Sequence, residues 1–185
     1  MTLPRSTPRL TLRRLSVADL SAFQAYRQCE ELSRYQGWTP QPDSEAMAFL
    51  NEMTSIVLFQ PQIWGQIGIA ENINGRLIGD IGICLSADGR SADIGFTLST
   101  AYHGKGFASE AVSETIAMLF EATTIERVIG ITDSRNVASI QLLERVGMKL
   151  HSTDKAMFRG EECDEHTYHF ERHAWPGRSD GNPID

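Results

Sequence analysis

The stretch from residue 103 to residue 109 reads HGKGFAS and has the composition of a phosphate-binding turn. It lies between a strand-like run and a helix-like run, so we expect a helix to begin near Gly106. The first N–H groups of a helix are free to donate and carry a partial positive charge, which suits an anion. Glycine lets the backbone approach a bulky anion, and Lys105 adds a full charge. This chemistry fits a pyrophosphate, although a plain glycine loop explains the turn alone about equally well.

Two familiar phosphate motifs are absent from this turn. A Walker loop requires Ser or Thr directly after its lysine, whereas Lys105 is followed by Gly106. The dinucleotide fingerprint requires a third glycine at the position of Ser109. The turn must therefore be interpreted from the elements around it.

Hydrophobic periodicity predicts the elements that position the turn. We expect strands over residues 9–15, 127–132, 148–159 and 164–174, and helices over 16–27, 108–122 and 136–147. A further helix should start at Asp43, with Ala46, Leu50, Met53 and Val57 on its buried face. Residues 62–99 predict a three-stranded antiparallel meander with a two-residue turn at Asn74–Gly75. This order predicts an α/β protein with a mixed sheet and helices on both faces.

Composition limits the class of protein. The chain has 185 residues, 41% of them hydrophobic, which suits one domain with a sizeable core. Its net charge of −7 argues against direct nucleic-acid binding and mildly favours a cationic partner. We expect no signal peptide and no membrane span, a cytoplasmic location and three reduced cysteines. Residues 176–185 are Gly/Pro/Asp-rich and predict a flexible tail.

The combination of ADIGFTLS, YHGKGFASEAV, RV and NVASIQLLERVGM, in this order, resembles the GNAT superfamily of acetyl-CoA-dependent N-acetyltransferases. The start of the chain reads TPRLTLRRLSVADLSAF. The start and the ending FERHAW are similar to the branch of RimJ/RimL-type ribosomal-protein N-terminal acetyltransferases. The resemblance covers residues 7–175 and implies one domain with a splayed central sheet of about seven strands. It implies acetyl-CoA as the acetyl donor and no metal.

The resemblance also implies which residues hold acetyl-CoA. The family's [Q/R]-x-x-G-x-[G/A] pattern falls on residues 103–108, where Gly106 and Ala108 match and His103 departs from the usual Gln or Arg. The residues implied in binding the pyrophosphate are His103, Gly104, Lys105, Gly106, Phe107, Ala108 and Ser109. Those implied in binding the pantetheine arm are Phe96, Thr97, Leu98, Asn136 and Ser139. Asn136 has an alternative role as the N-cap of its helix.

Acetyl transfer to an amine requires a base, oxyanion donors and stabilisation of the leaving thiolate. Asp93 matches the acidic position of the family's A-[DE]-I pattern and is the first candidate for the base. Asp80 is the reserve. The alternative for Asp93 is an exposed charge at a strand edge. Ser139 is the motif-matched hydroxyl for the leaving group, and its alternative is a surface serine of a first helical turn.

Three further groups were candidates. Tyr102 and Tyr168 could supply a proton to the leaving group, as tyrosines do in many relatives. Trp38, in the loop YQGWTP, could contact the acceptor or belong to the core. The histidines of the run CDEHTYHFERH would alternate between the faces of a strand, so we expect a polar strand and no metal site.

The predicted function is that of an enzyme. It would transfer an acetyl group from acetyl-CoA to a primary amine, either a protein N-terminus or a small molecule, by direct attack in a ternary complex. A non-catalytic CoA-binding module of the same fold and an O-acyl transferase remain the alternatives. Dimers are common among relatives, which leaves a homodimer as an expectation.

Overall fold

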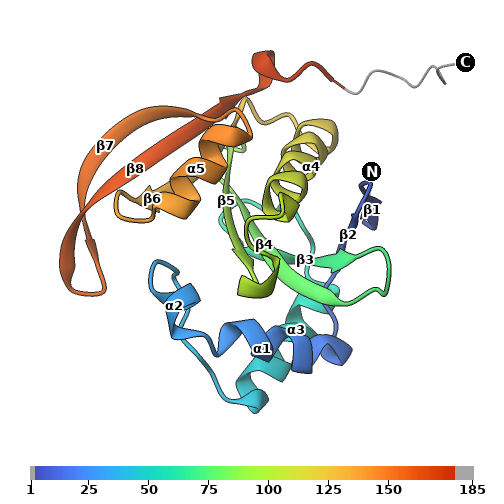
Figure 1. The fold of residues 1–185 in the computed structure, drawn as a ribbon. Coiled ribbons are helices and arrows are strands. Elements are labelled where there is room, and N and C mark those ends of the chain that lie inside the picture. The colour runs from blue at the N-terminus through green and yellow to red at the C-terminus, as the bar shows by residue number, and fades with distance from the viewer. Residues whose placement is uncertain (1–2, 178–185) are drawn as a thin grey trace, which may run out of the picture.

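One eight-stranded sheet forms the centre of the molecule in a computed structural model, which describes residues 3–177 (Figure 1). The strands are β1 (Arg5–Ser6), β2 (Leu10–Arg14), β3 (Gly65–Glu71), β4 (Leu77–Leu85), β5 (Ser91–Leu98), β6 (Arg127–Asp133), β7 (Lys149–Phe158) and β8 (Glu161–Glu171). Their order across the sheet is β1-β2-β3-β4-β5-β6-β8-β7. Every neighbouring pair is antiparallel except β5 and β6, which are parallel. The mixed α/β sheet is confirmed, with eight strands instead of about seven.

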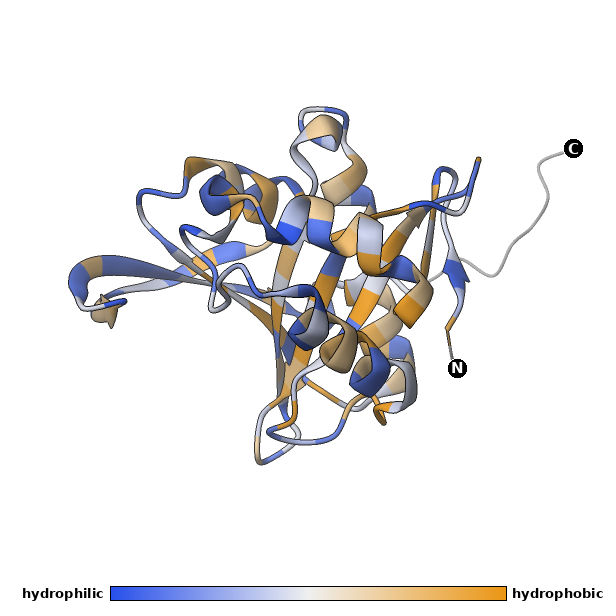
Figure 2. Cartoon of the chain, turned by 90° about the horizontal axis from the view of Figure 1, so that it is seen from below, coloured by the Kyte–Doolittle hydropathy of each residue, from blue (hydrophilic) through white to orange (hydrophobic). Residues whose placement is uncertain are grey.

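Helices cover both faces of this sheet, as expected. They are α1 (Leu20–Arg27), α2 (Glu30–Ser33), α3 (Asp43–Ser55), α4 (Phe107–Ala122) and α5 (Val137–Arg145). Leu77 packs in a cluster with residues of α1 and α3, whereas its neighbour Ile78 packs with residues of α4. Successive side chains of a strand point to opposite faces, so these helices lie on opposite sides. Figure 2 shows the apolar strands between the helices and the mostly polar β7–β8 arm at the left.

The sheet splays between its two parallel strands. Pairing of β5 with β6 covers only Ser91–Ile94 and Arg127–Gly130. Beyond Ile94, β5 continues to Leu98 paired with β4 alone, and β6 continues to Asp133 paired with β8 alone. Residues 95–98 of β5 therefore have one edge free of a neighbouring strand.

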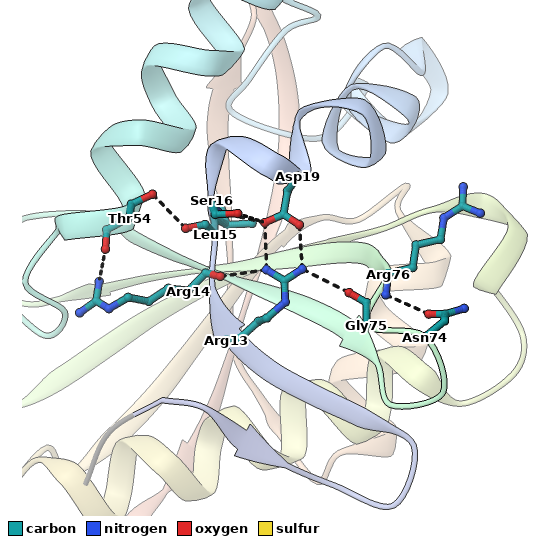
Figure 3. A network of polar contacts seen from close by, with 9 residues as sticks. All are labelled: Arg13, Arg14, Leu15, Ser16, Asp19, Thr54, Asn74, Gly75 and Arg76. Carbon is teal, nitrogen blue, oxygen red and sulfur yellow. Dashed lines mark hydrogen bonds and ion pairs between the residues drawn. The ribbon is translucent and has the colours of Figure 1, made fainter.

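A polar network fixes the start of α1 against the sheet (Figure 3). Arg13 donates two hydrogen bonds to the Asp19 carboxylate, at 2.7 and 2.9 Å, and the backbone N–H of Ser16 donates to the same group at 2.9 Å. Burial opposes ionisation of Asp19, yet the Arg13 guanidinium holds the pKa of that carboxyl below its usual value. Arg13 also reaches the carbonyl of Gly75 in the β3–β4 connection at 3.4 Å. The network sets the position of α1, which contributes three residues to the site described below.

Residues from the two ends of the described chain hold α4. Arg5, only 4% exposed, forms ion pairs with Glu114 and Glu121 at 2.6 Å. Arg172 donates to the carbonyl oxygens of Phe120, Thr123 and Ile125 at 2.8, 2.7 and 2.5 Å. These acceptors include carbonyls at the end of α4, which the helix itself leaves without donors.

Several local expectations were wrong. Helix α3 ends at Ser55, and Val57 is 61% exposed instead of buried. The β3–β4 connection covers residues 72–76, longer than the two-residue turn expected at Asn74–Gly75. Residues 62–64 precede β3 instead of belonging to it, and neither β1 nor α2 was expected.

Two further sequence expectations concern the ends and the membrane. The predicted tail at 176–185 lies outside the described residues except for Pro176 and Gly177. No helix within residues 3–177 is long and apolar enough to cross a membrane.

Candidate active site

A cavity of about 490 Å³ lies between strands β4 and β5 and the helices α1 and α3. Its lining includes Asp80 and Gly82 of β4 and Asp93, Gly95 and Thr97 of β5. The spacing of two along each strand places these residues on one face of the sheet. A cavity of this volume is in the range of small-molecule sites in proteins.

Asp93 lies half-buried in this cavity on an inner strand of the sheet, so it is not an exposed edge charge. Burial raises the pKa of its carboxyl above the ordinary value of 3.8. No ion pair to Asp93 exists within residues 3–177, so nothing offsets this cost of burying its charge. A carboxylate of this kind is suited to accept a proton.

Asp80, the reserve candidate, has a different environment. It is 2% exposed, and Arg27 donates to both of its oxygens at 2.8 and 2.9 Å. The hydroxyl of Tyr26 donates to Asp80 as well, at 2.5 Å, and burial raises the pKa of Tyr26 well above 10.0. Asp80 is therefore occupied by two donors, which makes it a poorer proton acceptor than Asp93.

Two backbone carbonyl groups on the free edge of β5 form hydrogen bonds with side chains. The carbonyl of Phe96 accepts from the Gln36 side chain at 3.2 Å, and the carbonyl of Leu98 hydrogen-bonds Nε2 of His103 at 2.8 Å. Backbone groups two residues apart point to the same edge of a strand. The side chain of Leu98 belongs to the core, and Thr97 is also buried. This edge can pair with an extended ligand only through its backbone.

The glycine turn forms the predicted helix start. Gly104 and Gly106 have φ values of +72° and +79°, a conformation that favours glycine, and Gly106 is the N-cap of α4. Space beside Gly104 is open, since a Cβ there would meet nothing within 4 Å. The Lys105 ammonium donates to the carbonyl of Ala101 at 2.8 Å. These features fit an anion held by backbone N–H groups.

Two other residues of the predicted phosphate set continue into the helix. Phe107 stacks edge-on against Tyr102, with ring centroids 5.8 Å apart, and Ala108 packs beside the core. The hydroxyl of Ser109 is buried and has no hydrogen-bond partner within residues 3–177.

Asn136 and Ser139 lie at the start of α5. The Asn136 side-chain oxygen accepts from the backbone N–H of Ser139 at 3.2 Å, so Asn136 is the N-cap. Because β5 and β6 are parallel, the helices that follow them, α4 and α5, begin at the same end of the sheet. Both helix starts therefore flank the splay. Neither Asn136 nor Ser139 lines the cavity that contains Asp93.

Trp38 does line that cavity, in the loop between α2 and α3. The Arg27 guanidinium lies over its ring at 4.4 Å from the centroid, and Arg159, in the turn between β7 and β8, donates to its carbonyl at 2.6 Å. The Nε1 group of Trp38 is buried without a partner among the described residues. Arg27 and Arg159 thus hold the loop in place, and the Trp38 Nε1–H group remains a donor without an acceptor among the described residues.

The tyrosines named as acid candidates lie elsewhere. The hydroxyl of Tyr102 donates to Glu71 at 3.0 Å, and that of Tyr168 donates to Glu144 at 3.2 Å. Neither residue lines the cavity, whereas Tyr35, which the sequence did not single out, does.

Sequence reasoning also missed Arg27, Trp64 and Gln66, which line the cavity. Arg27 belongs to α1, and the other two come from the segment that enters β3 and from β3 itself. No local motif marks them, because packing of α1 on the sheet brings them to the same place. Gly82 and Gly95 were the partial signal, since glycines within strands often mark a close approach or a ligand.

Two of the three histidines of the C-terminal run, His166 and His169, lie on β8 as expected, whereas His173 lies in the short 3-10 helix Arg172–Ala174. His166 meets Thr153 across the β7–β8 pair at 2.9 Å, and His169 stacks on His151 with centroids 4.0 Å apart. Within residues 3–177, no group of three or more His, Cys, Asp or Glu side chains could hold a metal ion. The cysteines Cys29, Cys84 and Cys163 are free.

Comparisons with known proteins agree with this geometry. The family model for the acetyltransferase (GNAT) domain matches residues 9–149. The uncharacterized N-acetyltransferase YoaA of Bacillus subtilis (strain 168) is 31% identical over 144 residues, which cover 77% of this chain and 81% of YoaA.

Solved structures share the fold. A GNAT-family acetyltransferase from Bacillus anthracis superposes with a TM-score of 0.82 at 20% identity, covering 91% of this chain and 98% of that one. RimL, the ribosomal L7/L12 alpha-N-protein acetyltransferase in complex with coenzyme A, gives a TM-score of 0.79 at 18% identity, covering 92% and 98%. With the splayed sheet and the match over residues 9–149, these findings lead to one conclusion: the chain belongs to the GNAT acetyltransferase family and is an N-acetyltransferase.

Proposed function

We propose that this enzyme transfers the acetyl group of acetyl-CoA to a primary amine that enters the cavity beside Asp93. The observation that carries the proposal is the half-buried carboxylate of Asp93, whose pKa burial raises, on the strand with the free edge. Acetyl-CoA supplies an acyl thioester, which the amine attacks directly in a ternary complex. The acceptor is either a protein N-terminus or a small amine.

The chain's own groups have distinct tasks in this proposal. Backbone N–H groups of residues 104–109 hold the pyrophosphate. The edge of β5 from Phe96 to Leu98 binds the pantetheine arm, and one of its N–H groups stabilises the oxyanion. When the arm binds, the carbonyl groups of Phe96 and Leu98 accept from it, and the side chains of Gln36 and His103 share or release these two groups. Asn136 and Ser139 complete the arm's binding at the start of α5, and Ser139 can donate to the sulfur.

Asp93 removes a proton from the ammonium, directly or through a water molecule. Only the neutral amine has the lone pair that attacks a carbonyl carbon. Trp38 and the aromatic residues near it exclude water from the acceptor and orient it. The base is thus the group whose loss should affect turnover without affecting the donor's binding.

Replacing Asp93 tests this role. Asp93→Asn should lower kcat by about 100-fold or more, while acetyl-CoA affinity stays within about twofold. Thiol release with an amine panel measures the rate, and calorimetry measures donor binding. Asp154→Asn, an exposed carboxylate on β7, is the matched control. An Asp93→Asn enzyme with full turnover would reject Asp93 as the base, and a wild-type protein that binds acetyl-CoA but acetylates no amine would reject the proposed reaction.

The pH profile provides a second test. The ionised carboxylate is the base, so kcat should rise as pH rises through the pKa of Asp93. Because burial raises that pKa, this rise should be centred above 3.8. It should disappear in Asp93→Asn, measured with saturating substrates over a pH series. Retention of the same rise in the variant would assign it to another group.

A further inference from the structure

The acceptor cavity has one uncompensated negative charge, which can balance one cation. Its charged lining residues are Arg27, Asp80 and Asp93, and the first two neutralise each other at 2.8 Å. Asp93 alone remains to balance an ammonium group. The net charge of −7 is therefore not concentrated here, and an acceptor with a second charge inside the cavity would lack a counter-charge.

The floor of the cavity is bare backbone at two neighbouring positions. Gly82 of β4 and Gly95 of β5 are cross-strand partners, and both line the cavity. A Cβ on Gly95 would meet nothing within 4 Å, so open space lies above it. A Cβ on Gly82 would approach the six-membered ring of Trp64 at 3.2 and 3.3 Å. The indole of Trp64 thus lies over one glycine, beside the empty space over the other.

The remaining walls are rich in aromatic rings. Two of the chain's three tryptophans line the cavity, Trp38 and Trp64. The opposite wall carries Phe23 and Phe49, whose rings stack with centroids 5.6 Å apart, and Tyr35 lines the cavity as well. Trp64 is 50% exposed, a large apolar area that a ligand would cover. Aromatic side chains beside an open space favour a flat apolar group.

We infer that the acceptor is a small monoamine on a flat aromatic body, which lies over Gly95 against Trp64 with its amine at Asp93. This inference rests on the proposed function, since it assigns the class of acceptor for that same site. The aromatic body is recognised by the rings, and the single ammonium by the single uncompensated carboxylate.

Three amines test the class of acceptor. 2-Phenylethylamine has the flat ring, 2-cyclohexylethylamine has the same carbon skeleton without a flat ring, and 1,3-diaminopropane brings a second ammonium into the cavity. At one pH, corrected for the neutral fraction of each amine, kcat/KM for 2-phenylethylamine should exceed that of the cyclohexyl analogue by up to about tenfold. It should exceed that of the diamine by about 100-fold. Equal values for all three would overturn the inference and leave the acetyl transfer established.

Variants test the place of the ring. Trp64→Leu should abolish the preference for the phenyl over the cyclohexyl amine, and Ile63→Ala, an exposed neighbour that does not line the cavity, should retain it. Binding is measured independently of turnover by calorimetry. Wild-type protein should bind 2-phenylethylamine saturably, and Trp64→Leu should bind it about tenfold more weakly.

The two readouts separate the inference from the proposed function. Saturable, Trp64-dependent binding without acetylation of any amine would support a flat aromatic monoamine as the ligand of the cavity and reject its role as an acetyl acceptor. Acetylation of peptide N-termini or of the diamine with no binding of 2-phenylethylamine would support the reaction and reject the assigned class.

Discussion

Asp80 and Asp93 are two carboxylates on one face of the sheet, and their partners give them opposite tasks. Asp80 is nearly inaccessible and accepts from Arg27 and Tyr26, whereas Asp93 has no charged partner among the described residues. The Asp80 carboxylate links β4 to α1 through Arg27, and the Asp93 carboxylate remains available to accept a proton. The sequence alone ranked them only by motif, because the distinction depends on a helix more than 50 positions away in the chain.

Removing the Arg27 guanidinium should leave a buried charge without its counter-ion. We expect Arg27→Met to lower the free energy of unfolding by about 3–5 kcal/mol, measured by urea denaturation. The double variant Arg27→Met/Asp80→Asn should recover a large part of that loss, since no charge stays buried. Arg34→Met, at an exposed arginine, should change the free energy by less than about 0.5 kcal/mol. No recovery in the double variant would mean that Arg27 stabilises by packing instead.

Asp133 offers a pH test at the end of β6. Hydrogen bonds from the Arg135 side chain hold the pKa of Asp133 at about 2, against 3.8 for the ordinary carboxyl. A lowered pKa adds stability that is complete above about pH 4 and is lost as pH falls toward 2. Asp133→Asn should thus be less stable than wild type at pH 6, with a difference that shrinks by pH 3, in urea unfolding at each pH. A constant difference would show that the charge of Asp133 is not responsible.

At the scale of elements, the start of α4 depends on a residue from the β1–β2 connection. Arg9 donates to Glu110 at 2.6 Å and to the carbonyl of Lys105 at 2.8 Å, and it lies over the ring of Phe107. Burial opposes ionisation of Glu110, but hydrogen bonds from Thr7 and Arg9 keep its pKa below the usual value. An unpaired Glu110 would place a negative charge within the first turn of α4, where we propose that the pyrophosphate binds.

Arg9→Met should therefore raise the KM for acetyl-CoA by about fivefold with little change in kcat, because about 1 kcal/mol of repulsion opposes the pyrophosphate. Glu110→Gln in the same chain should restore part of the loss by removing that charge. Steady-state kinetics at low salt measure both effects. A KM that stays high in the double variant would assign the whole effect to the lost contact with the turn.

Elements with local signals could be predicted, and those set by distant contacts could not. The helices α4 and α5 followed from hydrophobic periodicity and from the glycine turn. Gly147 directly follows the C-cap Val146, and its φ of +93° is typical of the residue after a helix. Strand β1 has two residues and exists because β2 pairs with it. Val57 fits the helical period of α3 but follows its last residue. Periodicity predicts a face but not the residue at which a helix ends.

At the scale of the whole molecule, one sheet is the shared wall of two apolar clusters. Leu50 belongs to the cluster under α1 and α3, Leu119 to the one under α4, and both are 0% exposed. Because β4 contributes to both clusters, loss of one should weaken the other. Residues 7–175 should therefore unfold as one cooperative unit.

The variants Leu50→Ala and Leu119→Ala test whether the two clusters unfold together. Each should lower the free energy of unfolding by about 2–5 kcal/mol and shift the entire transition. Near-UV and far-UV circular dichroism should give coincident curves in both variants. A separate early transition in Leu50→Ala would divide the chain into two domains.

The candidate site was also predictable from sequence only where it consists of contiguous residues. The turn at residues 103–109 and the start of α5 are contiguous motifs, so the donor's side of the site could be proposed from sequence. The cavity beside Asp93 draws on α1, the loop around Trp38, the segment before β3 and the β5 strand. Its composition depends on how these segments meet, which no spacing along the chain encodes.

The attachment of α4 at both ends has a consequence for synthesis of the protein. A ribosome extends a chain by about 5–20 residues each second and releases its amino terminus first. Arg5 can form its ion pairs only after Glu114 and Glu121 have been synthesised. The last carbonyl groups of α4 can accept hydrogen bonds from Arg172 only after that residue has been synthesised. The end of α4 therefore gains these donors only well after the helix itself has been synthesised. Strands β3, β4 and β5 precede α4 in the chain, so the face of the sheet that lines the cavity is synthesised before α4 gains all of its contacts.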